Sequence, residues 1–576
     1  MPMNNKKENM AEWFPQSANK QNSPKTKTST SSNPVVSTPT TRLGIVVGGS
    51  LSKGLVVKLE SAQSVENLAV GRYVVVHGAE KRFFCMLTDI ELNTTTPNIQ
   101  NDPPNMQDDF LRAVYSGTIA YGTLYVAPML SIDADGAPKP VKTIPNHFTE
   151  VYNASEQDVN DVFGQEDERH FNIGAPLELE QTQINLDLKR LVERSVGVFG
   201  KSGTGKSFLT RILLSGVISR KAAVNLIFDM HNDYGWQVTS ENGYSVKGLK
   251  QLFPDKVTII TLDEESSRRR DAPHDFSVKI AYTDITPEDI AMLKATMNLT
   301  DAMIDACYTL QKRWGDGWIA RLLDGRVDDI EEITEHTNVM AGTLAGLQRR
   351  LERFERWGFL SREPVEDSVE KIIHFLTQQE RSVVLEFGRY GNALDAYMLV
   401  ANYLSRRIHA EYVQRVEKSL GDSSLEPPQL MIVIEEAHKF LDPMVADQTI
   451  FGIIARELRK YKVTLLVVDQ RPSGIDEEVM SQIGTRVTAL LDNERDISAV
   501  LNGINGANSL REVLARLDTK QQAIIMGHAV PMPVVIKNRA YDEVFYSTIA
   551  NERNRHMREG AEDMRNALGS GGKKRV

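Results

Sequence analysis

Residues 200–207 of this 576-residue chain read GKSGTGKS and satisfy the pattern G-x-x-x-x-G-K-[S/T]. An apolar run at 196–199 precedes this stretch, and a run of helix-forming residues at 208–214 follows it. A strand, a glycine-rich turn and a helix in this order let backbone N–H groups curl around a triphosphate, while the helix N-terminus adds positive potential. The stretch therefore predicts a phosphate-binding loop for a nucleoside triphosphate.

The residues of this loop have different expected tasks. Lys206 is expected to reach the β- and γ-phosphates, and the hydroxyl of Ser207 is expected to bind Mg²⁺. Glycines permit the tight backbone turn between the strand and the helix. The residues that we predict to bind ATP are Gly200, Lys201, Ser202, Gly203, Thr204, Gly205, Lys206 and Ser207.

Polar residues follow two further apolar runs, at 430–434 and 463–468. Glu435 and Glu436 follow the first run, and Gln470 lies just after the second. Ligands of parallel sheets bind at the carboxyl ends of the strands. We expect Glu435 to hold the water shell of Mg²⁺ and Glu436 to polarise the water that attacks the γ-phosphate. The side-chain amide of Gln470 can position that water. The alternative interpretation of Glu435 and Glu436 is that they are two exposed glutamates at the end of a strand.

A cationic helix is predicted at 454–461, where Arg456 and Arg459 lie. Ring ATPases use an arginine from the neighbouring subunit to neutralise charge in the transition state. Arg459 is our candidate for this role and Arg456 is the second choice. An ordinary cationic helix surface is the alternative, since surface arginines are common.

A third group of polar residues follows the apolar run at 223–228. Asp229, His231 and Asp233 could suggest a metal site, but the chain offers no second cluster of ligands. Contacts with water or with the outer shell of Mg²⁺ are the better interpretation.

The composition indicates a cytoplasmic protein without a membrane anchor. Hydrophobic residues make up 41% of the chain and charged residues 25%, as in ordinary soluble proteins. No apolar run approaches the roughly 18 residues of a membrane span, and the N-terminus lacks the apolar core of a secretory signal. Cys85 and Cys307 are too few for a disulfide scaffold or a zinc cluster. The net charge of −10 argues against a protein that coats nucleic acid, but not against a local channel.

Changes in composition along the chain predict two folded domains. Short β-rich runs begin near residue 42 and suggest a small barrel or sandwich. Alternating strands and helices from about 186 predict an α/β ATPase domain with a mainly parallel sheet and a helical insertion. The predicted organisation is a disordered tail at 1–41, the β-barrel at 42–145, a connector at 146–185, the ATPase domain at 186–540 with its insertion at about 284–378, and a C-terminal helix and tail at 541–576.

Taken together, residues 42–540 resemble the HerA family of hexameric DNA translocases, within the wider group of FtsK-like and conjugative ATPases. The motifs that carry the resemblance occur in the family's order: GKSGTGKS, FDMHNDYG, VVLEFGRYG, IVIEEAHKF, IARELRKYKV, VVDQRPSGID and IIMGHAVPMPVVIKNR. The resemblance implies a RecA-like P-loop domain behind an N-terminal HAS barrel.

The resemblance also implies roles for single residues. Lys206 and Ser207 would bind ATP–Mg²⁺, Glu436 would be the catalytic glutamate, Arg459 would act in trans and Gln470 would act as a sensor. The chain departs from the family at two positions: Glu435 stands where Asp is common, and Asp469 stands where Ser is usual. Both departures keep a polar group in place, and both leave the turnover rate open.

At the level of function, the resemblance implies a homo-hexameric ring that pulls duplex DNA through a central channel. Family members work with an effector such as a NurA-like nuclease or a Sir2-like NAD-hydrolysing protein, in DNA-end processing or antiphage defence. The alternative is a hexameric ATPase scaffold that regulates an effector without processive translocation. A secretion or conjugation motor is disfavoured because no membrane anchor is predicted. The sequence leaves open whether 268–270 or the arginines at 349–356 contact DNA.

Overall fold

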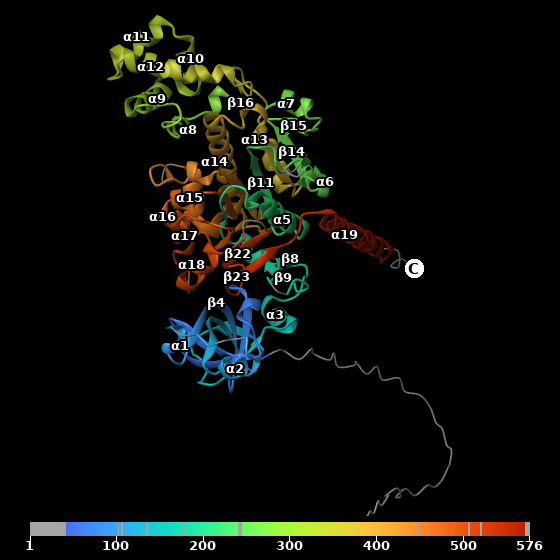
Figure 1. Cartoon of the computed structure of the whole chain (residues 1–576). Helices are drawn as coiled ribbons and strands as arrows, with labels where there is room; N and C mark the ends of the chain where they lie inside the picture. The colour runs from blue at the N-terminus through green and yellow to red at the C-terminus, as the bar shows by residue number, and fades with distance from the viewer. Residues whose placement is uncertain are drawn as a thin grey trace, which may run out of the picture. The chain divides into compact units, whose positions relative to one another are not determined.

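The protein is described here from a computed structural model, in which a β-barrel precedes a large α/β domain (Figure 1). The tail expected at 1–41 and the last residues, 571–576, lie outside the described residues. The structure describes residues 42–570 except for 102, 105–106, 134–135, 178, 240–242, 244, 447–448, 505–506 and 519–520.

The N-terminal sheet closes into a barrel because β2 pairs with both β1 and β5. Every neighbouring pair of its strands is antiparallel, and one face of each strand points inward to an apolar core that includes Val57, Val74, Cys85 and Val126. The barrel strands are β1 (Arg42–Ser50), β2 (Gly54–Leu59), β3 (Tyr73–His77), β4 (Arg82–Thr94), β5 (Ala120–Ile132) and β7 (Glu150–Asn153), with β6 (Pro138–Pro140) added beside β5.

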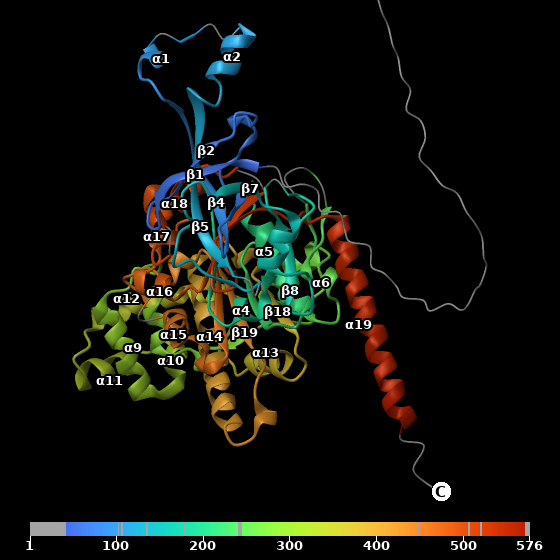
Figure 2. The same cartoon turned by 90° about the horizontal axis from the view of Figure 1, so that it is seen from below.

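Strands β4 and β5 continue beyond the barrel as a two-stranded ribbon (Figure 2). The ribbon carries the short helices α1 (Asn98–Asn101) and α2 (Asp109–Tyr115). Asp108 accepts hydrogen bonds from two backbone N–H groups of α2, so a local cap determines where this helix begins.

The α/β domain is built on a 12-stranded sheet in the order β15-β14-β18-β11-β19-β20-β10-β21-β22-β23-β8-β9. Pairings from β15 to β21 are parallel, and those from β21 to β9 are antiparallel. The expected fold class, a mainly parallel P-loop domain behind a small barrel, is therefore confirmed. The strands are β8 (His170–Ala175), β9 (Ile184–Asp187), β10 (Val196–Phe199), β11 (Val224–Asp229), β14 (Val257–Thr261), β15 (Phe276–Ser277), β18 (Ser382–Glu386), β19 (Leu430–Glu435), β20 (Val463–Asp469), β21 (Thr485–Thr488), β22 (Gln522–Gly527) and β23 (Val534–Asn538).

The central strands are buried along their whole length, which explains their nearly uninterrupted Val, Ile and Leu content. Two small sheets accompany the main one: β12 (Val238–Thr239) pairs with β13 (Ser245–Val246), and β16 (Ile280–Ala281) pairs with β17 (Leu360–Ser361). The helices of the ATPase core are α4 (Leu188–Val192), α5 (Lys206–Ser219), α6 (Leu249–Leu252), α7 (Glu264–Arg269), α13 (Ser368–Thr377), α14 (Leu394–Ser419), α15 (Ile450–Glu457), α16 (Glu477–Gln482), α17 (Glu494–Leu501), α18 (Ala507–Ala515) and α19 (Glu543–Ser570).

The inserted helices pack on one another around an apolar stripe. Leu344, Leu347, Leu351 and Phe354 recur at helical spacing, and all four are fully buried. The inserted helices are α8 (Pro287–Ala291), α9 (Asp301–Trp314), α10 (Trp318–Asp324), α11 (Val327–His336) and α12 (Ala341–Leu351).

The segment expected to be a connector, 146–185, is folded into both sheets. It supplies β7 to the barrel, and β8 and the start of β9 to the edge of the ATPase sheet, with α3 (Glu156–Phe163) between them. These strands are four to six residues long and lie among polar residues, so their alternation is too short to stand out in the sequence.

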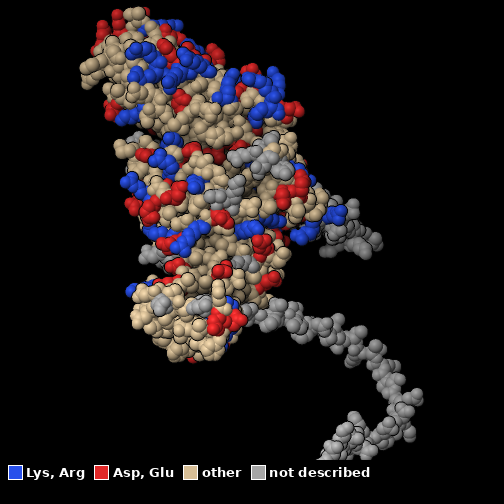
Figure 3. Space-filling view, in the orientation of Figure 1, with Lys and Arg blue, Asp and Glu red and all other residues tan. Residues whose placement is uncertain are grey.

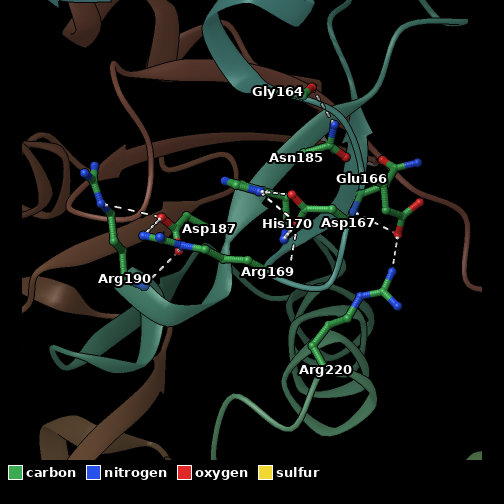
Figure 4. A network of polar contacts seen from close by, with 10 residues as sticks. Gly164, Glu166, Asp167, Arg169, His170, Asn185, Asp187, Arg190 and Arg220 are labelled. Carbon is green, nitrogen blue, oxygen red and sulfur yellow. Dashed lines mark hydrogen bonds and ion pairs between the residues drawn. The ribbon is translucent and has the colours of Figure 1, made fainter. Parts of the chain in front are cut away.

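Polar contacts attach this segment to the nucleotide-binding helix (Figure 4). Arg169 forms a two-pronged ion pair with Asp187, with N–O distances of 2.8 and 2.5 Å. Arg220, just after the last residue of α5, donates to Glu166 at 3.2 Å. The end of α5 opposite the phosphate loop is therefore tied to the segment that leads back to the barrel.

Candidate nucleotide-binding and hydrolysis site

The predicted phosphate loop joins β10 to α5, and its backbone requires glycine at particular positions. Gly203 and Gly205 have φ angles of 79° and 88°, in the left-handed region. At Gly200 a Cβ would lie 2.9 Å from the Cβ of Ala489, so a side chain there would collide with the neighbouring loop. The glycine-rich sequence thus follows from backbone geometry as well as from the need to approach a phosphate.

Hydrogen bonds hold this loop in a preformed curve. The N–H of Lys201 donates to the carbonyl of Leu490 at 3.1 Å, and the hydroxyl of Thr204 donates to the carbonyl of Lys201 at 2.8 Å. The ammonium of Lys201 pairs with Asp492 at 3.0 Å. The loop is therefore braced on the segment after β21, and Lys201 points toward that segment.

Lys206 lies where the loop meets α5, and acidic side chains lie around it. Its ammonium donates to the carbonyl of Lys201 at 3.0 Å. Burial lowers the pKa of Lys206, and the nearby carboxylates of Glu436, Asp469 and Glu435 oppose that effect. The carbonyl of Lys201 thus holds the Lys206 ammonium across the loop. Because this acceptor is neutral, a phosphate oxygen can replace it.

Acidic residues end four neighbouring parallel strands and line one edge of the sheet. Glu386, Asp229, Glu435 and Asp469 are the last residues of β18, β11, β19 and β20. All four are buried, and Asp229 pairs in register with Glu386. This row lies at the carboxyl edge of the sheet, where the phosphate loop also follows β10.

Two tyrosines hold Glu435 in place, and neither was singled out in the sequence. The hydroxyl of Tyr234 donates to Oε1 of Glu435 at 2.9 Å. The hydroxyl of Tyr397 donates to the backbone carbonyl of Glu435 and accepts from its N–H, both at 3.1 Å. Burial, together with the charge of Asp229, raises the pKa of Glu435 to about 8.

Glu435 offers the kind of oxygen ligand that a nucleotide-bound Mg²⁺ ion takes. The Oε2 atom of Glu435 is buried and has no hydrogen-bond partner, so one carboxylate oxygen is free to accept a ligand. Mg²⁺ at a phosphate site needs only one or two protein oxygens, because phosphate oxygens and waters supply the others. A cation beside Glu435 would also offset the burial that now favours its protonated form.

Asp229 serves the backbone rather than a metal. Its carboxylate accepts hydrogen bonds from the N–H groups of Asp233, Tyr234 and Gly235, at 2.7 to 3.1 Å. His231 is exposed, and the described residues contain no cluster of three or more His, Cys, Asp and Glu side chains that could hold a metal. The loop after β11 is thus a structural support that places Tyr234 against Glu435.

Glu436 and Gln470 meet directly, although 34 residues separate them. The side-chain amide of Gln470 donates to Oε1 of Glu436 at 3.0 Å. Glu436 has a φ of 50°, in the left-handed region that non-glycine residues seldom adopt. This turn of the backbone directs Glu436 away from the buried row, toward the end of β20.

His438 and Asp469 form a second pair beside Glu436. The Nδ1 atom of His438 lies 2.9 Å from Asp469 and 3.7 Å from Oε2 of Glu436. Burial alone would raise the pKa of Asp469, but hydrogen bonds from His438 and from the N–H of Arg471 hold it below its ordinary value. His438 follows β19 and Asp469 ends the neighbouring strand β20, but nothing in the sequence shows that the two side chains pair.

Arg459 lies at the opposite edge of the sheet from these acids. The turn η9 (Leu458–Tyr461) precedes β20, whereas Gln470 follows it, and seven residues of strand span roughly 20 Å. The side chain of Arg459 is outside the described residues. Arg456 pairs with Glu478 at 3.6 Å. The backbone of Arg459 therefore lies one strand length away from Gln470.

The basic run 268–270 is largely engaged in ion pairs. Arg269 pairs with Glu265 at 3.1 Å, and Arg270 pairs at 2.5 Å with Glu386, which is fully buried. Two of these three cations therefore have intramolecular partners, and this weakens the idea that the run is a DNA-contacting loop.

We expect Arg270→Ala to lower the free energy of unfolding by about 2 kcal/mol, because Glu386 would keep a buried charge without its counterion. The midpoint of urea unfolding measures this loss. The matched control is Arg268→Ala, at an exposed neighbour, which should change stability by less than about 0.5 kcal/mol. Equal midpoints for the two variants would contradict the assigned role of Arg270, and adding Glu386→Gln to Arg270→Ala should restore part of the loss.

Comparison with known proteins agrees with this geometry. Residues 171–408 match the family described as Helicase HerA, central domain. A preformed phosphate loop and acidic residues at the neighbouring strand ends define the protein as a P-loop ATPase, an ATP-hydrolysing enzyme. Within that class, the matched region is a HerA central domain, and the chain is similar to HerA helicases over most of its length.

Two named helicases and a solved structure illustrate the similarity. The chain is 23% identical over 415 residues to the DNA double-strand break repair helicase HerA of Pyrococcus furiosus, covering 68% of this chain and 73% of the relative. It is 37% identical over 149 residues to the protein of the same name from Sulfolobus acidocaldarius, covering 25% of this chain and 29% of that one. A solved structure similar to it is VirB4 of Thermoanaerobacter pseudethanolicus, with a TM-score of 0.42, 14% identity, and coverage of 65% of this chain and 98% of that one.

Proposed function

We propose that the protein is an ATP-driven DNA translocase or helicase that acts as a homo-hexameric ring with bound Mg²⁺. The observation that carries this proposal is the convergence of Lys206, Glu435, Glu436 and Gln470 at one sheet edge of a HerA-family ATPase. Relatives named as DNA double-strand break repair helicases support DNA as the substrate on which the motor acts.

The hydrolysis step follows from the positions of the side chains. Lys206 exchanges the Lys201 carbonyl for phosphate oxygens, and the loop N–H groups hold the remaining negative charge. Glu436 accepts the proton of the attacking water once Gln470 leaves its Oε1 atom and turns to that water. Mg²⁺, held by Ser207 and Glu435, would neutralise charge that develops on the phosphates.

The ring is proposed from the position of Arg459. Because Arg459 lies at the sheet edge away from its own Glu436, it can complete a hydrolysis site only in a neighbouring subunit. An arginine supplied in trans places ATP at a subunit interface and couples hydrolysis to movement between subunits. The hexamer is proposed because it is the assembly that the family resemblance implies.

DNA would pass through the central channel, and an effector enzyme would act on it. Arg349 and Arg356 are exposed on the insertion, where Lys and Arg interleave with Asp and Glu (Figure 3). The proposed effector is a NurA-like nuclease or a Sir2-like NAD-hydrolysing protein, in DNA-end processing or antiphage defence in the cytoplasm. Among the described residues, no helix combines the length and apolarity required to cross a bilayer.

The test of this function is ATP hydrolysis by the purified protein with and without linear duplex DNA. We expect DNA to raise kcat severalfold, because translocation couples each hydrolysis step to a bound strand. The stimulation should disappear with Lys206→Ala and in buffer that contains a Mg²⁺ chelator.

The second candidate is a scaffold whose ATPase regulates an effector enzyme. The hydrogen bond from Gln470 to Glu436 favours this candidate. While the Gln470 amide occupies Oε1 of Glu436, that oxygen cannot accept a proton from water, so a regulatory step that moves the amide would be needed. Hydrolysis that stays flat with DNA, in an intact hexamer, and rises only when the effector is added would replace the motor proposal with this one.

A further inference from the structure

An exposed aromatic ring lies directly beside the phosphate loop and has no part in the site described above. Phe208 follows Ser207 on the first turn of α5 and is 38% exposed, although the helix residues after it are buried. A large apolar side chain at a polar, charged mouth costs free energy unless something covers it. The position itself suggests what that covering group is.

The direction of the bound nucleotide follows from the groups already placed. If Glu436 and Gln470 act on the γ-phosphate as proposed, that phosphate would lie toward them, and the remaining phosphates would follow the loop N–H groups back to the start of α5. The N–H of Phe208, in the first turn, is among those without a partner inside the helix. The ribose and base must therefore continue past this first turn, where the ring of Phe208 is exposed.

Neighbouring side chains also hold the ring of Phe208 in place. Its centroid lies 6.4 Å from that of Tyr541 at an interplanar angle of 60°, and the guanidinium of Arg211 lies 5.4 Å from it. Arg211 is only 2% exposed and donates to the backbone carbonyl of Asp233, so it cannot swing away. Tyr541 in turn donates to the carbonyl of Lys247 at 3.0 Å. One side of the Phe208 ring is thus packed, and another part is open.

We propose that Phe208 is the platform on which the adenine base of ATP stacks, with Arg211 and Tyr541 as positioning residues that fix the ring. Base–aromatic stacking fits this geometry because it needs one open ring face held in a fixed orientation. Tyr541 lies two residues before α19, and Asp542 accepts hydrogen bonds from the N–H groups of Val544 and Phe545 at the start of that helix. The C-terminal helix would therefore be linked to the base through Tyr541 and Phe208.

The inference rests on ATP binding by the phosphate loop and not on DNA translocation. Its test uses the purified full chain without DNA, so a failure of the motor proposal would leave the result unaffected. Calorimetric titration gives the dissociation constants of ATP and of inorganic tripolyphosphate, a probe that has the phosphates but no base. We expect Phe208→Ala to weaken ATP binding roughly tenfold or more and to leave tripolyphosphate binding within about twofold.

Two further variants separate stacking from damage to the loop. Phe208→Trp keeps a flat aromatic face and should retain ATP affinity, whereas Phe110→Ala, at another exposed phenylalanine on α2, should change neither ligand. Unchanged ATP binding by Phe208→Ala would overturn the proposal. An equal loss for both ligands would overturn it too, since that result means a distorted loop, and so would a Phe208→Trp variant as weak as Phe208→Ala.

Discussion

Replacing Glu436 by Gln is expected to lower kcat for ATP hydrolysis by about 10²- to 10⁴-fold, the usual contribution of a positioned general base. The substitution keeps the shape of the side chain and its contact with Gln470 but removes its ability to take a proton from water. Glu436 accepts its side-chain hydrogen bond from Gln470 rather than from the phosphate loop, so the dissociation constant for ATP should stay within about twofold. Steady-state hydrolysis and equilibrium ATP binding, measured on the same preparation, check both parts.

The control for Glu436→Gln is Glu363→Gln, an exposed glutamate on the segment that follows β17. This variant should hydrolyse ATP at the parental rate. Steady hydrolysis by Glu436→Gln would sink the assignment of the base. A parallel loss of ATP binding would show that Glu436 supports the loop rather than the chemistry.

Lys206→Ala is expected to weaken ATP binding by about 10- to 100-fold and to abolish measurable hydrolysis. The ammonium donates to a neutral carbonyl, and in the nucleotide complex it would make charge-assisted hydrogen bonds worth about 1.5–3 kcal/mol. Its removal also leaves the carboxylates around the loop without the cation that faces them. Binding of a fluorescent ATP analogue, with hydrolysis measured in parallel, gives both quantities.

Lys201→Ala is the matched control, because it removes the other lysine side chain of the same loop and keeps the backbone groups that are expected to curl around the phosphates. Lys201 pairs with Asp492, whose side chain is largely exposed, so its loss should change ATP affinity only modestly. Similar losses for the two variants would mean that the loop responds to any lost lysine, and the specific role of Lys206 would have to be abandoned.

The site is partly readable from the sequence, because several of its groups are contiguous. The phosphate loop is eight successive residues between a strand and a helix, and Glu435 and Glu436 directly follow a buried run. Parallel strands bring their carboxyl ends to one edge of the sheet. This rule is enough to predict that Glu435 and Gln470 lie near the loop. The roles of these residues in hydrolysis remain predictions.

The side chains that orient these residues could not be predicted from the sequence. Tyr397 lies 38 residues before Glu435 on α14, and no local pattern marks it as the residue whose hydroxyl bridges the Glu435 backbone. The connector is a similar case, since β7 becomes a strand only because β1 and β3 provide partners on either side.

The sequence alone determined the features that depend on near neighbours along the chain: the glycine-rich loop, the buried strands and the apolar stripe at 344–354. These follow from backbone sterics and from periodic burial, which act over a few residues. Only the tertiary structure decided which partners meet across the sheet edge: Tyr234 with Glu435, His438 with Asp469, and Gln470 with Glu436. Those contacts depend on strand order, and strand order is set by the packing of the whole domain rather than by any one segment.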